Sequence, residues 1–158
     1  MTQINIKRVY ETPSSNDGYR VLVDRLWPRG MKREYLKYDY WAKELTPSND
    51  LRKWFHADVE KRWGAFADMY QKELERSHAV KTFIDRIKPY EKVTLLYASK
   101  NQEQNHARVL AQYLSTLFLV FVQKKANFAT VLGKKKDYDT KGSNRQSWRD
   151  SRTCNAFL

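Results

Sequence analysis

The sequence predicts an α/β fold, a Rossmann-like three-layer domain with a short, mainly parallel sheet flanked by helices. Two segments, 19–27 and 92–100, carry apolar side chains on both faces, as strands do when both faces are covered. Helix-like segments separate the two in the chain, so a parallel pair with a right-handed crossover is the simplest topology. Five Trp, ten Tyr and seven Phe residues exclude a largely disordered chain.

The beginning of the chain reads as two strands joined by a turn. Ile4 and Ile6 lie on one face of segment 4–11 and polar side chains on the other, which predicts a half-exposed strand. Segment 13–18 is a turn cluster of Pro, Ser, Asn, Asp and Gly. The buried strand 19–27 follows directly.

Helix signals dominate the middle of the chain. Pro28 ends the preceding strand, because a proline cannot donate to a strand ladder. Residues 32–45 are mixed and helix-prone. Ser48 and Asp58 are plausible N-caps of two helices, the second of which spans 59–76 with one apolar stripe. The stripe consists of Val59, Trp63, Phe66, Tyr70 and Leu74.

A further helix, a strand and a last helix complete the predicted order. Ser77 is expected to cap a helix that ends at residues 88–89, a Lys-Pro step. The buried strand 92–100 and a helix over 101–114 then form a strand–loop–helix unit. The pattern therefore predicts an α/β domain over residues 1–115.

Residues 116–158 are expected to be an atypical basic extension that is partly disordered. The formal net charge is +12, and this segment holds 9 of the 30 basic and 3 of the 18 acidic side chains. It opens with the apolar run "LFLVFV" and becomes polar from Lys134 onward. This composition fits two alternatives. The segment is either a functional tail or a product of read-through or of a shifted reading frame.

The cysteine content and the apolar runs of the sequence indicate where in the cell the protein is expected. The single cysteine, Cys154, has no intrachain partner, and the first residues contain no apolar run of signal-peptide length. The longest apolar run is far short of the ~20 residues of a membrane helix. We therefore expect a cytoplasmic protein with no membrane contact, and its oligomeric state stays open.

Charged and polar side chains follow both buried strands where those strands end. Asp24, Arg25 and Arg29 follow the first, and Tyr97 and Lys100 stand at the end of the second. Ligands of parallel sheets bind beyond the carboxyl ends of the strands. Because arginine grips phosphate or carboxylate groups with paired hydrogen bonds, the sequence predicts an anion-binding site there.

The start of the last helix adds two candidates to this site. Asn105 stands at a helix N-terminus, which favours anions, and His106 is a possible acid or base. Asp24 and His106 are the candidate catalytic residues if there is any catalysis. The alternative is purely structural: Asp24 pairs with Arg29 or Lys100 to close the end of the sheet, and His106 is a packing residue.

Several reactive-site motifs are missing from the sequence. It contains no HExxH, CxxC, Walker loop or G-x-G-x-x-G motif, and its five glycines are scattered. His56 with Asp58 is too small a set for a metal site. We therefore expect no metal and no cofactor, and enzymatic activity stays undecided.

Three stretches together identify a family resemblance. They are "RVYE…DGYRVLVDRLWPRG", "W-x-KEL-x-PS-x-x-LRKWF-x-x-D" and "VTLLYASK…NHA-x-VL". Over residues 4–115 the chain resembles the uncharacterised YeaO-like proteins, a branch of domain of unknown function 488. The resemblance implies a small α/β domain of bacteria or archaea, with no established activity.

The wider family differs from this chain in residues that suggest thiol or metal chemistry. The first motif of the wider family resembles Asp-x-Arg followed by Pro and Arg, which Asp24, Arg25, Pro28 and Arg29 match only loosely. The wider family also carries a Cys after the strand core and Cys-His-Arg on the helix. Those places hold Tyr97 and Asn105-His106-Ala107 here. The resemblance therefore implies no catalytic residue for this chain.

Three functions fit these observations. The leading one is binding, with or without turnover, of a small anionic or phosphorylated ligand at the strand ends. The second is a nucleic-acid-binding or interaction module that uses basic surface. The third is a non-catalytic structural partner protein.

Overall fold

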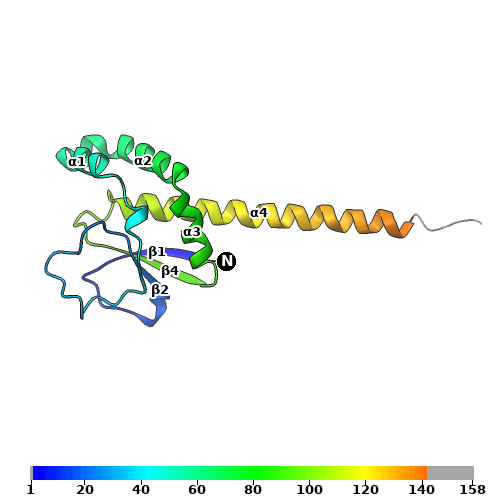
Figure 1. Cartoon of the computed structure of the whole chain (residues 1–158), viewed down its shortest axis with the longest axis horizontal. Helices are drawn as coiled ribbons and strands as arrows, with labels where there is room; N and C mark the ends of the chain where they lie inside the picture. Colours follow the sequence, from blue (N-terminus) through cyan, green and yellow to red (C-terminus); the bar gives the residue numbers. More distant parts are fainter. Residues whose placement is uncertain (1, 142–158) are drawn as a thin grey trace, which may run out of the picture. The chain divides into compact units, whose positions relative to one another are not determined.

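A parallel four-stranded sheet lies within the compact unit formed by residues up to Val120 (Figure 1). The computed structural model describes residues 2–141 and, for residue 122 and residues 125–141, the backbone alone. The strand order is β1-β4-β2-β3. The strands are Gln3–Arg8 (β1), Tyr19–Leu22 (β2), Tyr40–Trp41 (β3) and Lys92–Tyr97 (β4). The two buried strands predicted from the sequence, β2 and β4, are indeed parallel neighbours.

Four α-helices accompany the sheet in the described part of the chain. They are Asn49–Ala57 (α1), Val59–Arg76 (α2), His78–Ile87 (α3) and His106–Lys141 (α4). The Ser48 hydroxyl accepts the Leu51 N–H at 3.3 Å, and the Asp58 carboxylate accepts the Lys61 N–H at 3.4 Å. Both predicted caps are thereby confirmed. Ser77 precedes α3, but its side chain makes no capping hydrogen bond.

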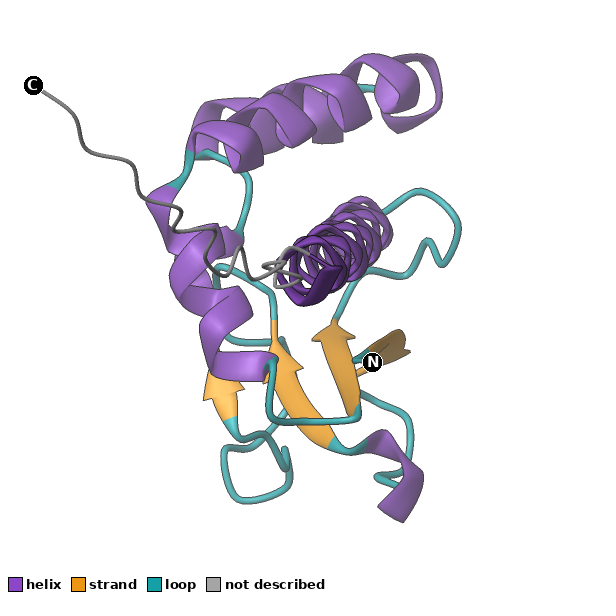
Figure 2. Cartoon of the chain, turned by 90° about the vertical axis from the view of Figure 1, so that its right-hand side faces the viewer, coloured by secondary structure: helices purple, strands orange, loops and turns teal. Residues whose placement is uncertain are grey.

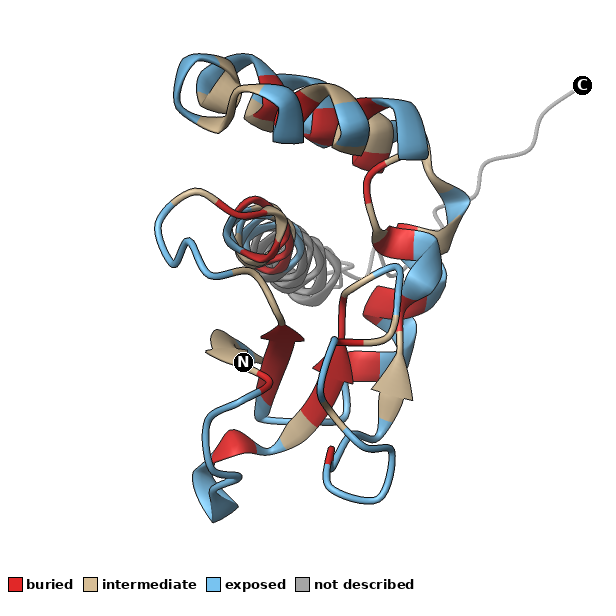
Figure 3. Ribbon diagram, turned by 90° about the vertical axis from the view of Figure 1, so that its left-hand side faces the viewer, coloured by how far each residue is buried: buried red, intermediate tan, exposed pale blue. Residues whose placement is uncertain are grey.

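The two faces of the sheet are covered differently. Val21 and Leu95 face the large core that the helices close, and Leu22 and Leu96 face a smaller cluster. Figure 2 shows the beginning of α4, residues 106–120, between the strands and the α1–α2 pair. The smaller cluster is closed by segment 24–39, which contributes Trp27, Met31 and Leu36. Buried residues run along the central strands in Figure 3. The predicted three-layer α/β class with a short parallel sheet is confirmed.

The helix-prone stretch 32–45 was interpreted wrongly from the sequence. It contains β3 and a short 3-10 helix, Lys43–Leu45, and no α-helix. Tyr40 and Trp41 pair with Val21 and Leu22 of β2. Pairing with a buried strand therefore overrides the weak local helix preference.

The boundaries of two elements beside the candidate site also differ from expectation. The strand predicted over 19–27 ends at Leu22. By the register of β2 with β4, Asp24 stands opposite Ala98, and its carboxylate takes the Ala98 N–H that a strand carbonyl would otherwise accept. The helix predicted from residue 101 begins at His106. The Asn101 side chain accepts the N–H groups of Glu103 and Gln104 in a local turn instead.

The expected boundary at residue 115 falls inside α4. This helix continues to Lys141, and residues 142–158 lie outside the described part, so the partial disorder expected for the extension stays a prediction. Phe118 is only 8% exposed and belongs to the large core. The first compact unit accordingly ends at Val120, and the second begins at Phe121. None of the helices described has the length and hydropathy of a membrane span.

Candidate functional site

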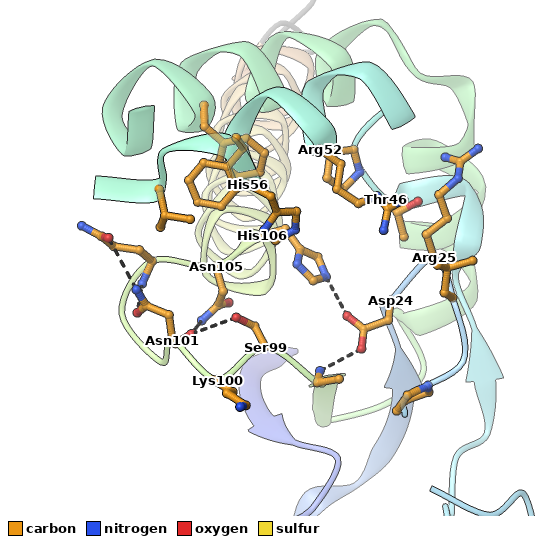
Figure 4. A pocket seen from close by; sticks show the side chains of 18 of the residues that line it. Asp24, Arg25, Thr46, Arg52, His56, Ser99, Lys100, Asn101, Asn105 and His106 are labelled. Carbon is orange, nitrogen blue, oxygen red and sulfur yellow. Dashed lines mark hydrogen bonds and ion pairs between the residues drawn. The ribbon is translucent and has the colours of Figure 1, made fainter. Parts of the chain in front are cut away.

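A cavity of about 440 Å³ lies beyond the carboxyl ends of β2 and β4 (Figure 4). Its lining comes from the loop after β2, the residues before α1, one face of α1, the start of α2, the loop after β4 and the start of α4. The polar and charged members are Asp24, Arg25, Arg29, Thr46, Arg52, His56, Ser99, Lys100, Asn101, Gln104, Asn105 and His106. This volume is in the range of small-molecule sites.

Asp24 joins three elements at the floor of this cavity. Its Oδ2 accepts the N–H of Ala98 at 2.8 Å, and its Oδ1 lies 3.2 Å from Nε2 of His106. Its backbone carbonyl accepts the indole N–H of Trp41 at 2.7 Å. Asp24 therefore connects the ends of β2 and β4 with the start of α4. The structural alternative named the right residue but the wrong partners, since neither Arg29 nor Lys100 pairs with it.

The contacts of His106 determine which ring nitrogen carries the proton. Nε2 lies 2.9 Å from the carbonyl oxygen of Val23 as well as 3.2 Å from the Asp24 carboxylate. A carbonyl and an ionised carboxylate only accept hydrogen bonds, so Nε2 must donate. In a neutral ring Nδ1 then holds the lone pair. The ring is about four-fifths buried and lines the cavity.

We predict that neutral His106 is the Nε2–H tautomer. Long-range ¹H–¹⁵N spectra at about pH 8, where an ordinary imidazole is neutral, should show a protonated Nε2 and an unprotonated Nδ1. The exposed His78 is the control and should show the tautomer mixture of a solvated ring. A protonated Nδ1 on neutral His106 would contradict the arrangement of the cavity floor.

The cavity carries more positive than negative side chains. Arg25, Arg29, Arg52 and Lys100 line it, and Asp24 is the one acidic residue in the lining. None of the four cations forms an ion pair with any carboxylate of the described residues. The buried Nε of Arg52 also lacks a hydrogen-bond partner there. In the view of Figure 4, Arg25, Arg52 and Thr46 lie on one side of Asp24 and His106, with Lys100 and Asn101 on the other.

Burial and nearby positive charge both disfavour a protonated His56. Burial and the neighbouring charges of Arg52 and His106 lower its pKa below the ordinary value of an imidazole. Burial is the largest cause, because it disfavours the charged ring. Nearby cations disfavour a further positive charge in the same way. An anion in the cavity would act in the opposite direction and raise the pKa of His56.

Five of the seven predicted site residues line the cavity and make no side-chain hydrogen bonds within their own loop. These are Asp24, Arg25, Arg29, Lys100 and His106. Asn105 also lines it, but its amide donates to the carbonyls of Asn101 and Gln102, and its Oδ1 caps α4 through the Arg108 N–H. Tyr97 is not in the lining; it is 4% exposed, within the large core.

Arg52, Thr46 and His56 are lining residues that the sequence analysis did not assign to the site. Arg52 and His56 are one helical turn apart on α1, so both point to one side of that helix. The spacing was visible in the sequence. The sequence does not show that α1 lies above the strand ends, because that position depends on the path of the chain through β3 and Pro47.

The fold and the cavity define a class: a small parallel α/β protein with a cationic cavity at the strand ends. A family model described as "Inactive DUF488-N3 subclade" matches residues 3–128, and the chain belongs to this family. The resemblance to YeaO-like proteins is thereby confirmed. The match extends past residue 115 and includes the "LFLVFV" run, so the family similarity does not end before that run as expected.

Similar proteins carry no assigned function. The uncharacterized protein YeaO of Escherichia coli (strain K12) is 46% identical over 114 residues, which are 72% of this chain and 98% of YeaO. Uncharacterized proteins of Mycobacterium bovis and Mycobacterium tuberculosis are each 39% identical over 114 residues, 72% of this chain and 95% of theirs. No solved structure is significantly similar to this chain.

Proposed function

We propose that the cavity binds a small anionic or phosphorylated ligand and does not transform it. The observation that carries this proposal is the set of four cavity cations, Arg25, Arg29, Arg52 and Lys100, without carboxylate partners among the described residues. Unpaired cations around a hollow are stabilised by an anion that enters it. The planar guanidinium group donates two parallel hydrogen bonds, which match two oxygens of a phosphate or a carboxylate group.

Two observations favour binding without turnover. Oδ2 of Asp24 already accepts the Ala98 N–H, and Oδ1 lies 3.2 Å from Nε2 of His106, so Asp24 is held as a connector rather than poised as a base. The subclade whose model matches the chain is described as inactive. A cytoplasmic location stays the prediction that accompanies this function.

Ligand binding should raise the thermal midpoint of the full chain. We expect inorganic phosphate, pyrophosphate or a nucleoside monophosphate to raise it in a concentration-dependent way, because a ligand of the native state stabilises that state. Arg52→Gln should weaken binding by about tenfold or more, since a charge-assisted hydrogen bond is lost. Arg76→Gln, on the exposed end of α2, is the matched control and should bind as the unaltered chain does.

The pKa of His56 locates the ligand. An NMR titration should show this pKa rising when phosphate binds in the cavity, because a neighbouring anion favours the protonated ring. The exposed His78 is the control, and its ring signals should not respond to phosphate. A thermal shift that leaves His56 unchanged and survives Arg52→Gln would place the anion elsewhere on the basic surface and contradict the proposal.

The alternative function is a nucleic-acid-binding module. Among the residues that the structure describes, six Arg or Lys side chains lie over aromatic rings, and cation–aromatic contacts also occur where single strands stack on protein surfaces. Cations converging on a cavity favour a small ligand, whereas cations spread over a convex face favour nucleic acid. Oligonucleotide binding that falls steeply with salt and persists in Arg52→Gln would support this alternative. If the chain binds neither kind of ligand, the third function, a non-catalytic structural partner protein, would be favoured.

A further inference from the structure

The cavity has an apolar side that a bare anion would not use. Leu26, Pro47, Phe55, Val59 and Phe66 line it together with the cations, and we call these five residues the apolar wall. Leu26 lies in the loop after β2 and Pro47 precedes α1. Phe55 lies on α1, and Val59 and Phe66 lie on α2. The rings of Phe55 and Phe66 are stacked, with centroids 4.0 Å apart and planes inclined by 17°. The wall is therefore built on a packed aromatic pair.

Leu26 is the exposed member of this wall. Its side chain is 63% exposed, next in sequence to the cation Arg25 and to Trp27. An exposed leucine on its own is ordinary. An exposed leucine that lines a hollow beside unpaired cations is in a position to be covered by whatever the cations hold.

We infer that the anion taken by this site is carried on a flat aromatic body, as in an aryl or heteroaryl phosphate, and this inference rests on the proposed function. The charged group is held by the cations, and the aromatic body packs against Leu26 and Val59, the two wall residues that are not buried. Pro47, Phe55 and Phe66 are buried and support these two from behind. Covering apolar surface is favourable in proportion to its area, so the body adds affinity that inorganic phosphate lacks. Arg25 and Arg52 also offer guanidinium planes, which prefer aromatic faces to aliphatic ones.

Guanidinium groups already lie over aromatic rings elsewhere in the chain. The Arg62 guanidinium lies 5.0 Å from the ring centroid of Trp54, and the Arg86 guanidinium lies 4.3 Å from that of Tyr40. In these pairs an aromatic side chain occupies the place beside the cation. Among the described residues no such ring lies over Arg25 or Arg52, and an aromatic ligand supplies one.

The test is a series of phosphates bound to the full chain by calorimetry. The series is inorganic phosphate, methyl phosphate, cyclohexyl phosphate and phenyl phosphate. We expect phenyl phosphate to bind at least about tenfold more tightly than inorganic phosphate and more tightly than cyclohexyl phosphate. Equal affinity of phenyl and inorganic phosphate would overturn the inference and leave the proposed function standing. Equal affinity of phenyl and cyclohexyl phosphate would overturn the aromatic character of the body.

Substitution of the wall separates its contribution from that of the cations. Leu26→Asn should weaken phenyl phosphate several-fold and leave inorganic phosphate unchanged, because only the aryl group contacts Leu26. Leu119→Asn, at a 51% exposed leucine outside the cavity lining, is the matched control and should alter neither. An unchanged preference for phenyl phosphate in Leu26→Asn would overturn the role of the wall. Failure of every phosphate to bind would instead refute the proposed function itself.

Discussion

A chain that ends after Ser115 is expected to unfold at a much lower denaturant concentration than a chain that ends after Lys124. The shorter chain lacks Phe118, which is 8% exposed in the large core, and Leu117, which packs against that core. Removing a buried phenylalanine side chain costs about 3–5 kcal/mol. Urea unfolding of both chains measures the difference through the shift in midpoint.

Two single substitutions in the full chain make the same test without truncation. Phe118→Ala should lower the free energy of unfolding by about 3 kcal/mol. Leu119→Ala, at the next and 51% exposed position, should lower it by much less. Equal stability of all these proteins would show that α4 contributes nothing to the core after residue 115. That result would support the boundary at residue 115 that the sequence predicts.

Asp17→Asn is expected to destabilise the protein by about 3 kcal/mol at neutral pH. Asp17 is 7% exposed and ends the short 3-10 helix Ser15–Asp17 that precedes β2. Its carboxylate accepts from Lys7 Nζ at 2.9 Å, from the Ser14 N–H at 2.9 Å, and from the Arg20 guanidinium. An uncharged amide in place of this carboxylate would leave two nearly buried cations without their anion. Such a loss is costly because water cannot replace the missing partner.

The pH dependence of this effect has a definite sign. Burial alone would raise the pKa of Asp17, but the hydrogen bonds from Ser14 and Lys7 and the charge of Arg20 together hold it below its usual value. Its stabilising contribution is therefore complete above the ordinary carboxyl pKa of about 4 and is lost as pH falls through the lower folded value. Unfolding measured between neutral and acid pH should show the gap between the two proteins closing at low pH. Asp85→Asn, on the exposed Asp85–Lys88 pair, should change little throughout.

The strand ends were predictable because the pattern that marks them is local. Both buried strands run into charged residues, and parallel neighbours must deliver those residues to one edge of the sheet. Arg25, Arg29 and Lys100 consequently line one cavity with Asp24. The caps Ser48 and Asp58 were predictable for the same reason, since a capping side chain acts on N–H groups two or three residues away.

The remaining features depend on contacts between distant parts of the chain. Tyr97 ends β4 on the face that the helices cover, so its ring enters the core rather than the cavity. Segment 32–45 has no strand pattern of its own, and β3 exists because β2 offers it an edge. Arg52 and His56 reach the cavity only because α1 lies above the strand ends. No spacing in the sequence reports such an arrangement.

The position of β4 in the sheet determines when the strands can pair during synthesis of the chain. β4 lies between β1 and β2, yet it is the last of the described strands to leave the ribosome. Ile4 and Tyr19 both stand beside Val93 of β4, on its two sides. Until residue 97 has emerged, β1 has no neighbour, and β2 has only the two-residue β3 beside it. Pairings this distant in sequence form slowly, and apolar strand edges stay open meanwhile. The nascent chain is therefore exposed to wrong strand pairing over most of its synthesis, and completion of β4 ends that exposure.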